Sequence, residues 1–373
     1  MTLEAMKDAL DQAIDSALGD QRVVGTVIRI AREGDEIYAG HAGLADREAG
    51  VAIQPDTIFR LASVTKPIVA ATALCLVEDG KLKLDAPVSD YLPYFHPKLA
   101  NGTEPRVTIH HLLTHTAGIS YRYDDPAISR GLENTDLGME ETFTRLAQKP
   151  LNYEPGTAWE YSMAIDVLGA VIAAVEGKSL ADSVEARITA PLGMNDTKFG
   201  VADPARLAVA YADGQPEPVR MTEPYTKHND DGTETIFSPA RIFNPLAYQS
   251  GGAGMAGTAG DILKFLEMLR NGGNGILSAD LINAGMQNQI GTVTRDPGMR
   301  FGYFGAVVED ATAAQTPCPE GTVTWGGIYG HDWFIDPVNK LSVMIATNTA
   351  TEGSNGQLPK DIRRAIYDNL ARG

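Results

Sequence analysis

The sequence contains little cysteine and little positive charge. Two of its 373 residues are cysteines: Cys75 lies in an apolar stretch and Cys318 in a loop-like Thr-Pro-Cys-Pro segment, so we expect two free thiols, neither of them catalytic. Lysine and arginine number 31 against 48 aspartates and glutamates, which gives a net charge of -17. This acidic balance argues against nucleic acid or an anionic membrane surface as a partner.

Long apolar segments and targeting signals are also missing. No run of about 18 or more apolar residues occurs, which excludes a transmembrane helix of the usual kind. Residues 1–20 carry acidic side chains in an amphipathic helical pattern, where a signal peptide needs a basic and then an apolar segment. We therefore expect a cytoplasmic protein without a membrane partner.

Several common site motifs are absent as well. No G-x-S-x-G occurs, so the nucleophile elbow of the α/β-hydrolases has no candidate serine. The glycine-rich residues 251–257 lack the Lys-Ser/Thr pair of a phosphate loop and are better explained by close backbone packing or by a loop that lines a site. His110, His111 and His115 include a pair spaced by four, but no Glu as in H-E-x-x-H and no evident third ligand accompany them. We expect no metal site and no cofactor.

One stretch, residues 61–67 (Leu-Ala-Ser-Val-Thr-Lys-Pro), carries a candidate nucleophile. Pro67 has no N–H and is tolerated only in a first helical turn, which places a helix N-terminus close to Ser63. Residues 68–77 are apolar with one exception, so this helix has no solvent face and is predicted to be buried. Side chains three positions apart share one helix face, so the Ser63 hydroxyl and the Lys66 ammonium point into the same space.

The S-x-x-K pattern is common by itself. It also fits an ordinary N-cap serine followed by a solvated lysine. Here, however, the polar pair stands at the mouth of an apolar helix, where it would be desolvated, and desolvated pairs of this kind are typical of functional sites. We therefore interpret Ser63 as a nucleophile with a base or proton relay, Lys66, beside it.

The remaining periodicities predict strands near both ends of the chain and helices between them. Strands are expected at residues 23–30, 36–43, 58–61, 301–308, 321–327, 331–335 and 341–347. Further helices are expected at residues 108–114, 139–148, 161–176, 180–188, 258–269, near 281, and at 359–370. Residues 202–250 are rich in Pro, Asp and Gly and lack clear periodicity, so they are predicted to be mostly loop.

This order of elements predicts an α/β fold in which one antiparallel sheet, flanked by helices, is built from both chain ends. The mostly helical middle of the chain is then an inserted domain. We expect residues 1–80 together with 251–373 to form the α/β sandwich and residues 81–250 to form the helical insert. The active site is expected to lie between these two parts.

Two further motifs accompany the candidate nucleophile. Tyr161-Ser162-Met163 follows a Pro-Gly loop at the start of a predicted helix, and Trp325-Gly326-Gly327 lies in a predicted C-terminal strand. With these motifs the sequence resembles the serine β-lactamase-like hydrolases, and most of all the family VIII carboxylesterases, which are similar to class C β-lactamases. Residues 107–118 and 326–331 are also similar to that family, and the resemblance extends from the region of Ala5 to the C-terminus.

The resemblance implies a role for each motif. By it, Ser63 is the acyl-accepting nucleophile, Lys66 its activating partner, and Tyr161 the phenolic base and proton shuttle. It also implies an oxyanion hole made by the backbone N–H groups of Ser63 and Ile328. Desolvation lowers the pKa of a buried lysine, and a neighbouring ammonium lowers that of a phenol, so either group can accept the serine proton. The sequence leaves open which of the two is the resting base.

Two departures from the family pattern bear on the substrate. Lactamases and transpeptidases usually carry Asn at the third position of the tyrosine motif and Lys-Thr-Gly on the strand, where this chain has Met163 and Trp325-Gly326-Gly327. An indole and a thioether form an apolar wall that offers no cation to a substrate carboxylate. We therefore expect Met163, Trp325, Gly326 and Gly327 to line a pocket for a small neutral carboxylic ester, cleaved through an acyl-enzyme on Ser63.

Two other functions stay open at this stage. One is a β-lactamase, D-amino-acid peptidase or amide hydrolase of the same fold, and the other is a catalytically silent binding or scaffolding protein. The burial of three reactive side chains together disfavours the silent alternative, because a scaffold has no need of them. The sequence thus predicts a carboxylesterase-type serine hydrolase, with acyl chain preference, acyl transfer to alcohols and oligomeric state left open.

Overall fold

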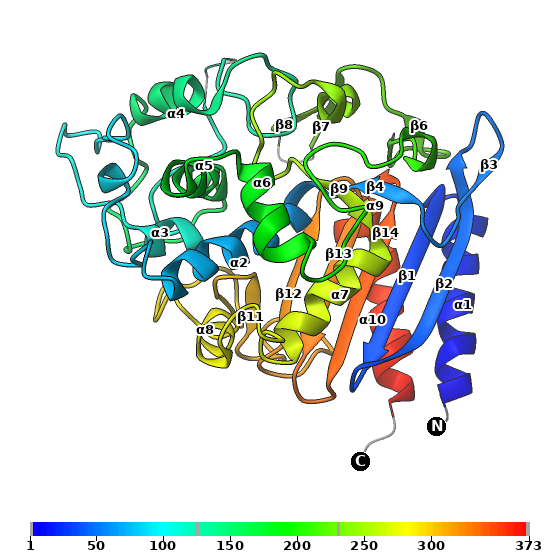
Figure 1. The fold of residues 1–373 in the computed structure, drawn as a ribbon. Coiled ribbons are helices and arrows are strands. Elements are labelled where there is room, and N and C mark those ends of the chain that lie inside the picture. Colours follow the sequence, from blue (N-terminus) through cyan, green and yellow to red (C-terminus); the bar gives the residue numbers. More distant parts are fainter. Residues whose placement is uncertain (1–2, 124, 126, 230–231, 371–373) are drawn as a thin grey trace.

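The computed structural model describes residues 3–123, 125, 127–229 and 232–370, and a large antiparallel sheet runs through it (Figure 1). Within these residues eight strands form the sheet in the order β10-β11-β12-β13-β14-β1-β2-β3. The strands are β1 (Gly25–Arg32), β2 (Asp35–Asp46), β3 (Val51–Ala52), β10 (Met299–Phe301), β11 (Ala306–Val308), β12 (Val323–Gly327), β13 (His331–Asp336) and β14 (Leu341–Thr347). Because β1 pairs with β14 along its length, the two ends of the chain meet at the centre of one sheet, and the predicted fold is confirmed.

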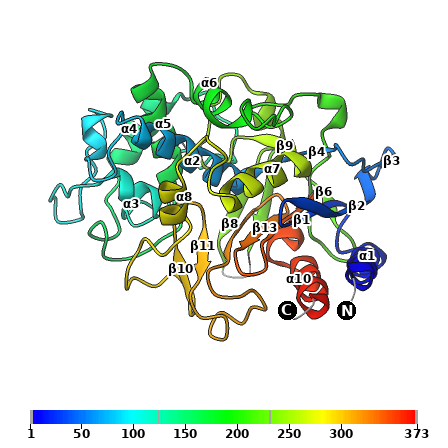
Figure 2. The ribbon, with the colours of Figure 1, turned by 60° about the horizontal axis from the view of Figure 1, so that its bottom comes forward.

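Helices cover both faces of this sheet. α1 (Leu3–Gly19) and α10 (Gln357–Asn369) lie side by side on one face, and α7 (Ala259–Arg270) crosses the other (Figures 1 and 2). Neighbouring residues of a strand point to opposite faces, so Val343 packs with α1 and α10 whereas Met344 packs with the core on the α7 side. The central strands β13 and β14 are buried along their length because both of their faces are covered.

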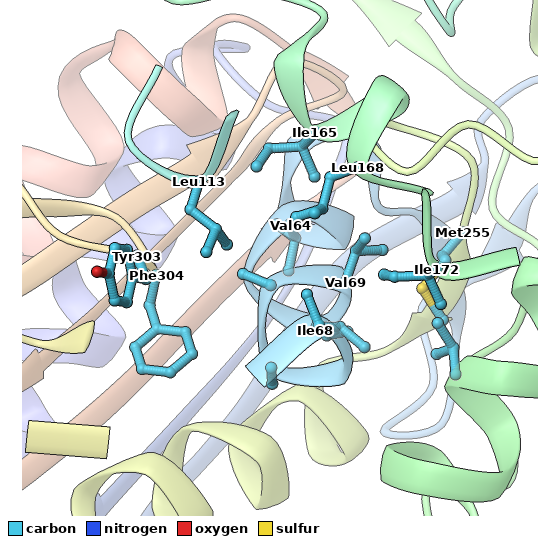
Figure 3. Packing of buried hydrophobic residues seen from close by; sticks show 14 of the residues in the cluster. Val64, Ile68, Val69, Leu113, Ile165, Leu168, Ile172, Met255, Tyr303 and Phe304 are labelled. Atoms are coloured by element: carbon cyan, nitrogen blue, oxygen red, sulfur yellow. The ribbon is translucent and has the colours of Figure 1, made fainter. Parts of the chain in front are cut away.

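The helix that carries the candidate nucleophile, α2 (Thr65–Glu78), lies between the sheet and the helical part of the chain. Its residues are buried as far as Leu76, so the prediction of a helix without a solvent face is confirmed. Figure 3 shows Val69 of this helix beside Ile172 of α5 (Ala164–Glu176). Full burial of such a side chain contributes about 1.5–3 kcal/mol, so α2 is a firmly held base for the residues at its N-terminus.

The middle of the chain holds several helices joined by long loops, with a few short strands. Its helices are α3 (Ile109–Leu113), α4 (Met139–Ala147), α5 and α6 (Leu180–Val184), which continues into a π-helical turn, Glu185–Thr189. β4 (Ile58–Arg60) pairs with β9 (Ala256–Thr258), β7 (Tyr225–His228) with β8 (Glu234–Phe237), and β5 (Tyr211–Ala212) with both β6 (Val219–Arg220) and β15 (Thr349–Ala350). α8 (Ala279–Gly285) and α9 (Glu352–Asn355) follow later in the chain. The division into two domains at residues 80 and 250 stays a prediction.

One sequence prediction about local structure needs correction, and a second holds with an addition. Residues 301–308 were expected to form one strand, but they hold parts of two, because the Gly302 N–H donates to the Gly305 carbonyl at 2.8 Å and closes a turn between β10 and β11. Residues 202–250, expected to be mostly loop, also contain β5 to β8. Most of the residues in these short strands are exposed or only half-buried, so their sequences carry little of the apolar alternation that marks a strand.

The scarce cysteines are free thiols. Cys75 and Cys318 are both buried. Burial raises the pKa of the Cys75 thiol to about 12, which keeps it protonated and unreactive at neutral pH. Each cysteine packs in one of the two main hydrophobic cores.

In the part of the chain that the structure describes, no helix combines the length and the apolar character that crossing a bilayer requires.

Candidate active site

Ser63 stands in a sharp bend between β4 and α2. A 3₁₀ turn, Ala62–Val64, contains it, and α2 begins two positions later, slightly beyond the predicted helix start. Ala62 adopts a φ of 45°, which residues other than glycine rarely do. Ser63 is half-buried and lines a pocket of 850 Å³. The bend therefore places the hydroxyl at the boundary between the core and an open cavity.

Lys66 lies one helical turn after Ser63 and contacts it directly. Its Nζ donates to Ser63 Oγ at 3.0 Å and to the carbonyl oxygen of Gly252 at 2.7 Å. Lys66 is only 5% exposed, and its Nζ also lies 4.7 Å from the ring centroid of Tyr161. An ammonium removed from water requires such partners, and here they point it at the serine.

Tyr161 reaches Ser63 from the helical part of the chain. The helix expected from residue 161 begins only at Ala164, so Tyr161 lies in the segment that enters α5. Its Oη donates to Ser63 Oγ at 2.6 Å, and the indole N–H of Trp325 donates to the same Oη at 3.4 Å. The structure thus brings together the three predicted catalytic side chains, with the serine oxygen between an ammonium and a phenol.

Aromatic rings surround Tyr161. The ring centroids of Tyr121, Trp325 and His115 lie 5.3, 5.0 and 5.0 Å from that of Tyr161. Desolvation holds the pKa of His115 well below its ordinary value of 6.5 and raises that of Tyr121 well above 10, so both rings are neutral at neutral pH. The Lys66 ammonium therefore faces a shell of neutral rings.

The glycine-rich loop at residues 250–254 packs its backbone against α5. A Cβ at Gly252 would lie 2.3 Å from Asp166 Oδ2, so only glycine permits this approach. The same approach brings the Gly252 carbonyl to Lys66, and the next residue, Ala253, lines the pocket. Close packing and site lining, the two interpretations of this segment, are both confirmed.

Ile328 follows β12 and lines the same pocket as Ser63. A Cβ at Gly327 would lie 2.3 Å from the carbonyl oxygen of Leu61, and one at Gly326 would lie 2.4 Å from a backbone oxygen of β13. These two glycines were expected to line the substrate pocket. Instead, the position that a side chain would take on each glycine is occupied by neighbouring backbone. The two glycines therefore allow β12 to lie close to the Ser63 bend.

The prediction that Met163 lines the pocket is wrong. Its side chain is 0% exposed and belongs to the core that surrounds α2. The physical reason is its position at the N-cap of α5, a helix whose first turns are buried. Trp325 is half-buried and reaches the site through its hydrogen bond to Tyr161. Of the proposed wall of thioether and indole, only the indole contacts the site.

The pocket beyond Ser63 has aromatic, apolar and charged walls. Tyr121, Leu132 and Ile236 contribute rings and aliphatic groups. Arg130 and Glu133 also line it, and Arg130 Nε donates to Glu133 Oε1 at 2.5 Å. The Arg130 guanidinium is therefore already paired with a carboxylate of the protein.

The three histidines of residues 110–115 do not converge. His110 Nδ1 lies 3.0 Å from a tyrosine hydroxyl, His111 accepts the N–H that precedes α3 at 3.2 Å, and His115 Nδ1 lies 3.2 Å from the hydroxyl of Ser162. Among the described residues, no group of three or more His, Cys, Asp or Glu side chains is arranged to hold a metal ion. Each histidine thus has a hydrogen-bond partner of its own, and the three belong to the packing around α3 and Tyr161.

Sequence reasoning missed two residues behind Lys66. Asp166 is fully buried, and its Oδ1 accepts from Ser250 Oγ at 2.5 Å and from the Gly252 N–H at 3.2 Å. A signal for Asp166 was present, because it is the one charged residue in the apolar run 164–175. Ser250 carried no comparable signal, since serine is ordinary in a glycine-rich loop.

Comparison with known proteins establishes the family. A family model described as Beta-lactamase matches residues 10–367, and the chain belongs to this family. Esterase EstB of Burkholderia gladioli is 49% identical over 370 residues, which cover 96% of this chain and 94% of that protein. The resemblance drawn from the three motifs is thereby confirmed.

Solved structures agree with this assignment. EstCE1, described as a hydrolase with promiscuous acyltransferase activity, superimposes with a TM-score of 0.94 at 41% identity, covering 98% of this chain and 99% of that chain. Unliganded simvastatin synthase LovD from Aspergillus terreus superimposes with a TM-score of 0.75 at 23% identity, covering 99% of both chains. At that identity the second likeness shows the fold alone.

Proposed function

We propose that this chain is a carboxylesterase that cleaves small neutral carboxylic esters through a covalent acyl-enzyme on Ser63. One observation carries the proposal: Ser63 Oγ lies 3.0 Å from Lys66 Nζ and 2.6 Å from Tyr161 Oη at the wall of an 850 Å³ pocket. A hydroxyl held between these two groups is placed to lose its proton and to attack a carbonyl. The similarity to Esterase EstB and to the hydrolase EstCE1 supports an ester as the substrate.

Acylation starts when Ser63 Oγ attacks the ester carbonyl carbon. As that bond forms, the serine proton passes to the pair formed by Lys66 and Tyr161. Negative charge develops on the carbonyl oxygen, and the backbone N–H groups of Ser63 and Ile328 are the proposed donors to it. The bond to the leaving alkoxide then breaks, and the alkoxide takes up the same proton. The products are a free alcohol and an acylated serine.

Deacylation repeats these steps with water as the nucleophile. Water gives a proton to the Lys66 and Tyr161 pair and attacks the acyl carbon. The tetrahedral intermediate expels Ser63 Oγ, which recovers the proton, and a carboxylic acid is released. One ester and one water thus become one acid and one alcohol, and the steps balance without a redox or metal cofactor.

The walls of the site support a neutral substrate. Aromatic rings of Tyr121 and Tyr161 face the pocket close to Ser63, and the Trp325 ring packs against that of Tyr161 at a tilted angle. A substrate carboxylate placed among these rings would lose its hydration, and the Arg130 guanidinium on the pocket wall is already paired with a carboxylate of the protein. A small uncharged ester avoids this cost of desolvation.

The alternative is a β-lactamase, D-amino-acid peptidase or amide hydrolase of the same fold. The observation that favours it is the presence of two guanidinium groups, those of Arg122 and Arg130, on the pocket wall. If either meets the carboxylate of a β-lactam or a peptide, the preference for neutral esters disappears. A substrate comparison therefore separates the two candidates.

The test measures kcat/KM for p-nitrophenyl acetate and butyrate, a chromogenic cephalosporin and D-amino-acid anilides. We expect the short esters to exceed the cephalosporin by at least about 100-fold, which corresponds to roughly 2.7 kcal/mol in activation free energy. Ser63→Ala should abolish turnover, whereas Ser16→Ala, on the exposed face of α1, should leave it unchanged. Comparable efficiency on esters and cephalosporin would replace the esterase assignment by the lactamase one.

A further inference from the structure

A buried carboxylate lies behind Lys66 without an ion-pair partner. Asp166 is 0% exposed, and its Oδ2 has no hydrogen-bond partner among the described residues. Within the same residues no Lys, Arg or His nitrogen forms a salt bridge with it. A buried unpaired charge is strongly destabilising, so its presence in the core requires an explanation.

A continuous chain of hydrogen bonds joins this carboxylate to Lys66. Lys66 Nζ donates to the Gly252 carbonyl at 2.7 Å. The N–H of the same peptide unit, that of Ala253, donates to Ser250 Oγ at 3.0 Å, and Ser250 Oγ donates to Asp166 Oδ1 at 2.5 Å. We call the Gly252–Ala253 peptide and the Ser250 hydroxyl the peptide relay.

Every donor in the peptide relay points from the ammonium toward the carboxylate. Hydrogen bonds aligned in one direction polarise each other, and the low dielectric of the interior strengthens them further. The positive charge of Lys66 and the negative charge of Asp166 therefore stabilise each other although the two side chains do not touch. Glycine at position 252 is required for this arrangement, since a side chain would collide with Asp166.

We propose that Asp166 is a positioning residue: it is the buried counter-charge of Lys66 and acts through the peptide relay. It keeps Lys66 protonated and directed at Ser63. This inference rests on the proposed function, because it assigns the resting charge of the same site. With Lys66 held as an ammonium, the acceptor of the Ser63 proton is the oxygen of Tyr161 in its phenolate form, which the ammonium stabilises, and the phenol so formed returns that proton to the leaving alkoxide.

Two of the rings that face Lys66, those of Tyr121 and His115, are neutral at neutral pH. Its Nζ lies over the rings of Tyr161 and Tyr121, at 4.7 and 5.6 Å from their centroids. His115, from the segment after α3, interacts with it electrostatically, and burial lowers the pKa of this histidine so far that it stays uncharged. Neither the Tyr121 ring nor the His115 ring supplies the negative charge that a buried ammonium needs.

The groups that face Asp166 include one further cation. Tyr248 lies within electrostatic range, and burial raises its pKa well above 10, so it is neutral. Burial raises the pKa of the Asp166 carboxyl, and Lys66 is the strongest of the influences that lower it again. Arg241 acts more weakly, and its guanidinium donates to two backbone carbonyls, one of them that of Tyr248. Lys66 is thus the principal positive charge that Asp166 experiences.

The test compares Asp166→Asn with a matched control, Asp261→Asn. The first change keeps Oδ1 as an acceptor for Ser250 and removes the negative charge. Asp261 is also a buried aspartate whose carboxylate accepts a backbone N–H, but it lies on α7 and pairs with Lys264. Values of kcat and KM for p-nitrophenyl butyrate are measured across the pH range with both variants and the parent protein.

Asp166→Asn is expected to lower kcat by at least about tenfold with little change in KM. The alkaline limb of its pH–rate profile should move to lower pH by about one unit, because removal of an anion destabilises a neighbouring cation. Asp261→Asn should leave the profile in place. An equal loss of rate at every pH, or the same behaviour in both variants, would reduce Asp166 to a structural residue and overturn the proposal.

Ser250→Ala covers the case in which Asp166→Asn does not fold. It interrupts the peptide relay and leaves the charge of Asp166 in place, so the alkaline limb should move in the same direction by a smaller amount. An unchanged limb in this variant also overturns the proposal. Labelling of the parent protein with a fluorophosphonate separates this inference from the proposed function. An adduct on Ser63 supports the acyl-enzyme, whatever the two variants show. If the active protein forms no adduct on Ser63, the proposed acyl-enzyme is wrong.

Discussion

The carbonyl oxygen of Gly252 accepts a hydrogen bond from Lys66 Nζ at 2.7 Å, across 186 positions of sequence. The contact exists because position 252 has no side chain: a Cβ there would lie 2.3 Å from Asp166 Oδ2. One glycine therefore fixes both the distance between the loop and α5 and the direction of the ammonium. This relationship leads to the first prediction.

Gly252→Ala should lower kcat/KM by about 100-fold and reduce the melting temperature. The new methyl group must displace either the loop or Asp166, so the acceptor of Lys66 moves, and a displacement of this size in an active site has effects of that order. Gly260→Ala is the matched control, because a Cβ at Gly260 meets nothing within 4 Å. The control should change the free energy of unfolding by less than about 0.5 kcal/mol and leave activity intact. Equal activity in the two variants would contradict the prediction.

Lys66→Ala and Tyr161→Phe should each reduce kcat by several orders of magnitude, and the double variant should fall little further. Both groups contact the same serine oxygen and share one proton path, so the loss of either removes the function of both. Steady-state kinetics on a p-nitrophenyl ester gives the three values. Losses that multiply would mean that the two groups act independently.

Trp325→Phe should lower kcat by about 2–10-fold with an unchanged KM, the effect of losing one hydrogen bond worth roughly 0.5–1.5 kcal/mol. The substitution keeps an aromatic ring beside Tyr161 and removes the indole N–H that donates to its Oη. Because Trp325 acts on the proton path, the loss should appear in kcat. A change confined to KM would show instead that the indole contacts the substrate.

Glu176→Gln should destabilise the protein by about 2 kcal/mol near neutral pH and by less near pH 3. Hydrogen bonds from the Arg187 guanidinium, with smaller contributions from Lys178 and Lys81, lower the pKa of the Glu176 carboxyl to about 2. A depressed pKa means that the contribution is complete above the pKa of the unfolded chain, about 4.3, and is lost as pH falls toward 2.

Urea unfolding of the parent and variant at the two pH values measures this difference. Glu185→Gln is the control, because Glu185 is an exposed acid at the start of the neighbouring π-helical turn. Its effect should be small at both pH values. A penalty for Glu176→Gln that does not depend on pH would show that the carboxylate contributes through packing alone.

The sequence was sufficient for features that depend on local patterns. The apolar run of α2, its proline in the first turn and the serine and lysine beside it predict a buried helix with a polar pair at its start, since helix periodicity and turn chemistry are properties of neighbouring residues. The strands near both chain ends predict a shared sheet for the same reason. The order of three short motifs was enough to suggest the family, which the matching family model then established.

Packing decided which side chains face the pocket. Met163 and Tyr161 are two positions apart in one motif, yet Met163 is fully buried in the core and Tyr161 lies beside the nucleophile. The difference follows from where α5 begins, at Ala164, and from how that helix docks on α2. A sequence motif gives the spacing of residues but not the rotation of the helix that they precede.

The sequence by itself therefore determined the buried nucleophile helix, the sheet that joins the two chain ends and the three reactive side chains. Only the tertiary structure decided how the charge of Lys66 is balanced. The peptide relay joins a loop to two helices. In the sequence, Gly252 is 186 positions away from Lys66. Contacts at such separations depend on the docking of whole elements, where a difference of one ångström makes or breaks a hydrogen bond, and no local pattern encodes that distance.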